Sequence, residues 1–153
     1  MMRMLPLLLA LLLPACRGTG AEGLDAPSLI DMARLERPGT PNTALAAPAG
    51  FVPAPDIVTR RYAVEPDRLL AVVQAVALGQ ARTVEHAMFA GQRQAHFVAR
   101  SALLNFPDLV AVQVTPESGL ILWSRSIYGR SDFGVNKARL EAWLAALEAR
   151  LAQ

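Results

Sequence analysis

The run LVAVQVT-PESG-LILWSRSI, residues 109–127, decides the fold. In residues 109–115 valines alternate with smaller or polar side chains, which is the period-two pattern of a half-buried strand. Residues 116–119 carry Pro and Gly where a tight turn needs them, and residues 120–127 return as a second strand. Strands joined by so short a turn pair side by side, so this run predicts an antiparallel sheet.

A second hairpin is predicted upstream of this run. Residues 82–90 and 94–103 are rich in strand formers and flank the sequence AGQR, in which Gly91 can take a positive φ. A further strand is predicted over residues 56–64, where β-formers lie between prolines.

Two stretches show helical spacing of apolar residues. The first follows Pro66, which suits a first helical turn, and ends at Gly79. The second runs over residues 135–152 with an apolar stripe of Leu and Trp. The resulting order is strand, helix, four strands, helix. It predicts one α+β domain over residues 56–153, in which two helices cover one face of an antiparallel sheet of about five strands in two layers.

The first fifteen residues predict a signal peptide. Arg3 supplies a positive start, and residues 4–15 form an apolar run that is too short to span a bilayer core of ~20 residues. Pro6 and Pro14 argue against a buried core helix in this run.

The sequence Leu13-Pro14-Ala15-Cys16 resembles the lipobox of bacterial lipoproteins, in which the cysteine is acylated. This resemblance implies a lipid anchor at Cys16 and a place on the periplasmic side of the bacterial cell envelope. Arg17 is not the aspartate that marks inner-membrane retention, so the outer membrane is favoured. The alternative is simple secretion, with cleavage near Gly20 or Ala21.

Between the anchor and the domain we expect two segments without regular structure. Residues 16–27 are predicted to be a flexible tether, because they are rich in Gly and Ala and lack hydrophobic periodicity. Residues 28–55 are predicted to be a proline-rich strap that begins with a short helix, 29–34, capped by Ser28. Its prolines are expected to exclude regular sheet pairing. Alternatively, the strap holds Arg37 and Asn42 rigidly beside a site.

Charge and cysteine content exclude several classes of function. The chain carries 15 basic and 13 acidic side chains, and removal of residues 1–15 takes away only Arg3. So small a net charge argues against nucleic acid as a partner. The single cysteine rules out an internal disulfide.

Polar residues cluster densely in residues 125–139, between the last predicted strand and the last helix. A loop between two glycines that opens a helix can direct backbone N–H groups at an anion. The candidate ligand-binding residues are Arg125, Arg130, Ser131, Asp132, Asn136 and Lys137. The alternative is structural: Ser131 or Asp132 caps the helix, and the arginines form ion pairs or face water.

This run, RSIYGRSDFGVNKAR, resembles the signature of the bacterial family called domain of unknown function 1499. The resemblance covers about residues 38–151 and includes the Pro41-Asn42 pair, although Thr43 lies where many relatives place a cysteine nearby. The function of that family is not established. The resemblance therefore implies a secreted or membrane-tethered α+β domain and assigns no catalytic residue.

His86 and His96 are the weak candidates for a metal site. They lie on the two strands of the upstream hairpin and face each other directly if its loop has an odd number of residues. A shift of one residue would send them to opposite faces. The chain has no HExxH motif and no Gly-x-Ser-x-Gly elbow.

Two functions from different classes follow. The favoured one is a non-enzymatic envelope lipoprotein domain, without cofactor, that binds an anionic small molecule, a lipid or another envelope protein. The alternative is a metal-dependent or hydrolytic envelope enzyme that uses His86, His96 and Asp132.

Overall fold

The computed structural model describes residues 18–153, so the predicted signal peptide and Cys16 lie outside the described residues. Its elements in chain order are η2 (Met32–Arg34), β1 (Thr43–Pro48), β2 (Ile57–Thr59), α1 (Pro66–Leu78), β3 (Thr83–Phe89), η3 (Ala90–Gln92), β4 (Gln94–Arg100), β5 (Pro107–Val114), β6 (Leu120–Ser126) and α2 (Val135–Leu151). Neither α-helix in this part of the chain is long and apolar enough to cross a membrane.

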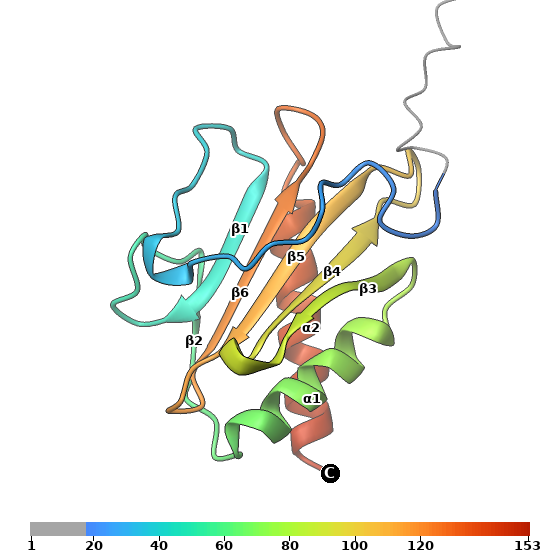
Figure 1. The fold of residues 1–153 in the computed structure, drawn as a ribbon. Helices are drawn as coiled ribbons and strands as arrows, with labels where there is room; N and C mark the ends of the chain where they lie inside the picture. Colours follow the sequence, from blue (N-terminus) through green and yellow to red (C-terminus); the bar gives the residue numbers. More distant parts are fainter. Residues whose placement is uncertain (1–17) are drawn as a thin grey trace, which may run out of the picture.

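Residues 43–126 supply a single six-stranded sheet in the order β2-β1-β6-β5-β4-β3. Every neighbouring pair is antiparallel except β1 and β2, which are parallel. Both helices pack on the same face of this sheet (Figure 1). The predicted α+β class is therefore confirmed, and β5 and β6 form the hairpin expected from residues 109–127.

The main core lies between the sheet and the two helices. Alternate residues of the central strands point into it, including Phe97, Val110 and Leu122, and the apolar stripes of α1 and α2 meet them. The rings of Phe97 and Trp143 pack edge to face with their centroids 5.8 Å apart. The predicted helix start at Pro66 and end at Gly79 are both seen.

The expectation that the proline-rich strap forms no regular sheet pairing is wrong for residues 43–48. They form β1, which lies between β2 and β6 and is buried over most of its length. The reason is that the prolines bracket this stretch rather than interrupt it, with Pro41 before the strand and Pro48 as its last residue. The sheet thus has six strands instead of about five, and only residues 57–59 of the expected strand 56–64 pair with it.

The outer face of the sheet, opposite the helices, is also covered. Met32, Leu45, Ile121 and Trp123 belong to a second apolar cluster on that face. Strand β5 is consequently buried on both faces, whereas its alternating sequence predicted a half-buried strand. Its period-two pattern is real, but the second face meets protein instead of water.

Residues 18–35, here called the outer segment, run across this outer face (Figure 1). The Arg100 guanidinium donates hydrogen bonds to the carbonyl oxygens of Gly20 (2.9 Å) and Glu22 (2.7 Å). The side-chain amide of Gln94 pairs with both backbone groups of Ile30 at 2.8 Å each. From Gly18 onward the stretch expected to be a tether is thus attached to the sheet by side chains of β4.

Two local expectations are corrected. The helix predicted over residues 29–34 is a single 3-10 turn, Met32–Arg34, and Asp31 rather than Ser28 caps it. In the β3–β4 hairpin, Arg93 takes the positive φ of 49° that Gly91 was expected to take. The turn begins as η3, so the left-handed residue is the one that closes it.

Candidate functional site

The predicted ligand-binding residues separate onto the two faces of the sheet. Ser124 and Ser126 of β6 face α2, where both contact the Asn136 side chain. Arg125, between them, points to the outer face, where it lines a cavity together with His96. This split follows from the strand itself, because successive side chains of a strand point to opposite faces.

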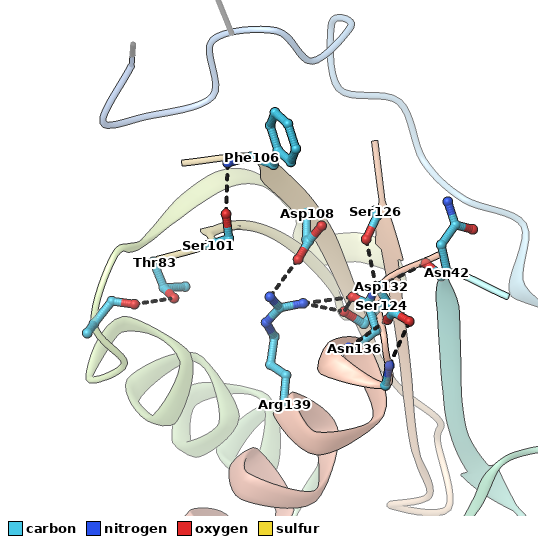
Figure 2. A network of polar contacts seen from close by, with 12 residues as sticks. Asn42, Thr83, Ser101, Phe106, Asp108, Ser124, Ser126, Asp132, Asn136 and Arg139 are labelled. Atoms are coloured by element: carbon cyan, nitrogen blue, oxygen red, sulfur yellow. Dashed lines mark hydrogen bonds and ion pairs between the residues drawn. The ribbon is translucent and has the colours of Figure 1, made fainter. Parts of the chain in front are cut away.

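On the helix face, Asn136 is the centre of a buried polar network (Figure 2). Its side chain is fully buried, and its Oδ1 accepts hydrogen bonds from the Ser124 hydroxyl and from Arg139 Nη1 at 2.7 Å. Its Nδ2 donates to the Asn42 carbonyl oxygen and to Ser126 Oγ, each at 3.0 Å. All four hydrogen-bonding positions of the amide are therefore used.

A buried ion pair extends this network. Arg139 Nη2 lies 2.6 Å from Asp108 Oδ2, and both side chains are largely shielded from water. Arg139 Nη1 also donates to Ser124 Oγ at 3.1 Å. Arg139 is not among the site residues predicted from the sequence. Its position one helical turn after Asn136 was the available signal, because residues three apart on a helix share a face.

Asp132 caps α2 with its own carboxylate. Its Oδ1 accepts from the Gly134 N–H at 3.0 Å and its Oδ2 from the Asn136 N–H at 2.8 Å. The helix N-terminus is the place where an anion was expected to bind, and there the chain's own carboxylate accepts from two of the backbone donors. Asp132 thus has the capping role that was the structural alternative. Arg130, Ser131 and Lys137 lie exposed on the surface.

The outer face carries a different candidate site, a cavity of about 350 Å³ between the outer segment and the sheet. We call it the outer cavity. One wall is formed by residues 23–28 and Ile30, and the other by His86, His96, Leu109, Arg125 and Ile127. A second, more open hollow of about 430 Å³ shares Ile30 and Arg125 with it and is lined by Arg37 as well.

A β-bulge brings His86 and His96 to this same cavity. The β3–β4 connection pairs Phe89 with Gln94, so an unbroken ladder would place His86 opposite Phe97, on the helix face. The register instead shifts between Glu85 and Ala87, and His86 is the extra residue. The condition for direct pairing, an odd number of loop residues, is not met, and Ala87 lies opposite His96, yet both histidines line the outer cavity.

His96 is held in its neutral form. Burial, followed by the nearby His86 and Arg125 charges, lowers the pKa of His96 to about 4. Its Nε2 lies 2.7 Å from Gln94 Oε1. Ile30 fixes the orientation of that amide by donating to the same oxygen, so Nε2 carries the imidazole proton and Nδ1 remains an acceptor.

Arg125 supplies positive charge at the outer cavity. Its side chain is exposed, and it forms no ion pair with any acidic group in residues 18–153. Arg37, which lines the neighbouring hollow, is by contrast paired with Asp56 at 2.7 Å. An anion in the outer cavity would therefore meet a cation whose charge is not already neutralised.

The three residues of the enzyme alternative are not brought together. His86 and His96 line the outer cavity, while Asp132 is engaged with the first turn of α2. Among residues 18–153 no group of three or more His, Cys, Asp or Glu side chains is placed to hold a metal ion.

Residues 35–147 of this chain match the model of a known family, which is described as a protein of unknown function (DUF1499). The chain belongs to this family. The match contains the complete Asn136 network and the sheet wall of the outer cavity, whereas most of the outer segment precedes it. No curated protein and no solved structure matches the chain.

We predict that Asn136→Ala lowers the free energy of unfolding by about 3 kcal/mol, because it removes all four side-chain hydrogen bonds of the buried amide from the network. Chemical denaturation measures this change. The control is Lys137→Ala, the exposed neighbour, for which we expect a change within about 0.5 kcal/mol. Equal stability of the two variants would show that the network does not stabilise the domain.

The low pKa of His96 predicts a pH-dependent stability. Below its ordinary pKa of 6.5, His96 binds a proton in the unfolded chain, but in the folded chain it stays neutral until about pH 4. Neutral His96 therefore contributes fully to the free energy of unfolding above pH 6.5. This contribution, up to about 3 kcal/mol, is lost as the pH falls towards 4. His96→Gln removes the titrating group. The difference in unfolding free energy between wild type and variant should change across that window, and parallel curves would contradict the assignment.

Proposed function

We propose that this protein is a bacterial envelope lipoprotein whose domain binds a small anionic amphiphile in the outer cavity. The observation that carries the proposal is Arg125, an arginine without an acidic partner in the described residues, at the edge of a cavity whose walls carry both polar and apolar side chains. A carboxylate or phosphate would pair with its guanidinium, which presents a planar fork of donors to such groups.

The apolar part of the walls suits an apolar body for this ligand. The apolar side chains that line the cavity are Leu24, Pro27, Ile30, Leu109 and Ile127, and they alternate with the polar side chains of Asp25, Ser28, His86 and His96. Its volume of about 350 Å³ lies at the lower end of the range for small-molecule sites, roughly 300–1,000 Å³. Neutral His96 adds a hydrogen-bond acceptor, which suits a hydroxyl or amide group next to the anionic head.

The envelope location is supported by the sequence before the domain. The apolar run 4–15 ends in Leu13-Pro14-Ala15 and is followed by Cys16, which is the form of a lipoprotein signal. An acylated Cys16 would hold the domain at the membrane. The residue after it, Arg17, favours the outer membrane, with the domain on the periplasmic side.

Arg125 is tested with two probes that differ in one charged group. Anilinonaphthalene sulfonate is an anionic amphiphile, and phenylnaphthylamine is its uncharged counterpart. We expect Arg125→Gln in the full chain to weaken binding of the sulfonate about tenfold, which corresponds to about 1.4 kcal/mol, and to leave the uncharged probe unaffected.

The matched control for this experiment is Arg130→Gln, an exposed arginine five residues further along that does not line the cavity. It should bind both probes as the wild type does. Fluorescence titration measures the affinities. Equal losses for the two arginine variants would mean that the probe responds to surface charge in general, and the cavity assignment would then be wrong.

The anchor is tested at Cys16. We expect Cys16→Ser to move the protein from the membrane pellet to the soluble fraction, because the acyl chains can no longer be attached. Arg17→Ala, at the adjacent position, should stay in the pellet. Intact mass measurement of the wild type should show the added acyl groups. An unmodified cysteine together with unchanged fractionation of Cys16→Ser would refute the lipid anchor.

A further inference from the structure

Three segments meet at one end of the sheet, at the top of Figure 1. They are the start of the outer segment, the β4–β5 loop (residues 101–106) and the β6–α2 loop (residues 127–134). Asn105 Nδ2 donates to the Gly18 carbonyl oxygen at 2.8 Å. The rings of Phe106 and Tyr128 are 6.2 Å apart, and the Tyr128 hydroxyl donates to the Gly23 carbonyl oxygen at 3.2 Å. We call this region the loop end.

Large apolar side chains protrude from the loop end into solvent. Phe133 is 96% exposed and Leu103 is 91% exposed, which makes them the most exposed large hydrophobic residues of the described chain. Leu104, next to Leu103, and Val135, two residues after Phe133, are also exposed. Apolar side chains at the tips of adjacent loops have no core to enter, so their burial requires a partner outside this domain.

The charges at the loop end and beside it favour an anionic partner surface. Arg130 and Lys137 are exposed, and Arg82 donates to the Asn105 side chain at the same end. Two of the acidic groups there are already engaged: Asp132 caps α2, and Glu22 lies 3.2 Å from the guanidinium of Arg100. Backbone hydrogen bonds around Glu22 lower its pKa, so that carboxylate stays ionised in its local contacts.

The chain itself indicates which surface this is. Gly18, held at the loop end by Asn105, is two residues from Cys16, a distance of at most about 7 Å along a fully extended chain. A lipid on Cys16 therefore holds the loop end directly at the membrane surface. The exposed leucines and Phe133 would lie at the depth of the lipid headgroups.

We infer that the loop end docks on the bilayer surface, with Leu103, Leu104 and Phe133 inserted at the boundary between headgroups and acyl chains and Arg82, Arg130 and Lys137 at the phosphates. Apolar side chains flanked by basic residues are the combination that binds such an interface. This inference rests on the lipid-anchor part of the proposed function and is independent of the ligand in the outer cavity.

The orientation is tested with tryptophan and brominated lipids. Leu103→Trp and Phe133→Trp are made singly in the full chain, which is purified from membranes. Each variant is reconstituted into vesicles of phosphatidylcholine with a minor share of phosphatidylglycerol whose acyl chains carry bromine. The matched control is Val52→Trp, because Val52 is 78% exposed and follows the opposite end of β1. The native Trp123 and Trp143 are buried and supply a background measured in the wild type.

We expect bromine to quench the added fluorescence about twofold or more at positions 103 and 133 and to leave position 52 unquenched, since interfacial insertion reaches ~5–10 Å into the bilayer. Quenching at only one of the two loops, or equal quenching at position 52, would overturn the inferred orientation. Protein that fails to sediment with the vesicles would overturn the docking and the lipid anchor together. In that case anion binding in the outer cavity would still be tested separately by the Arg125→Gln variant.

Discussion

The arrangement of this domain depends on the hydrogen bonds made by the buried side-chain amide of Asn136. It joins the backbone before β1, the end of β6 and the start of α2 through Asn42, Ser124 and Ser126. Within the described residues no buried side-chain nitrogen or oxygen lacks a hydrogen-bond partner. An amide with four donor and acceptor positions in a dry site tolerates few alternatives, so it specifies how the last helix meets the sheet.

The two faces of β6 therefore have different roles. On the helix face, Asp132 and Asn136 hold the β6–α2 junction together, and their side chains are engaged in contacts within the domain. The adjacent residue of β6, Arg125, faces the other way and supplies charge to the outer cavity. A single strand thus serves structure with one face and presents a cation with the other.

The outer segment connects the remaining features. It forms one wall of the outer cavity, it is attached to β4 through Arg100 and Gln94, and it begins at the loop end beside Asn105. Gly23 and Ile127 line the cavity and belong to the segments that meet at the loop end. The cavity and the apolar loop tips are therefore neighbours, joined by the part of the chain that leads back to Cys16.

The sequence by itself determined the parts of the fold that depend on local pattern. Period-two and helical spacing located the hairpin 109–127 and both helices, and Pro66 and Gly79 marked the ends of α1. Only the tertiary structure decided that residues 43–48 enter the sheet, that a bulge turns His86 to the outer face, and that Arg139 pairs with Asp108, 31 residues away. Periodicity and turn chemistry act between near neighbours in the chain. Pairing partners, register shifts and buried ion pairs depend on which distant atoms come within reach, and this is settled when the layers pack.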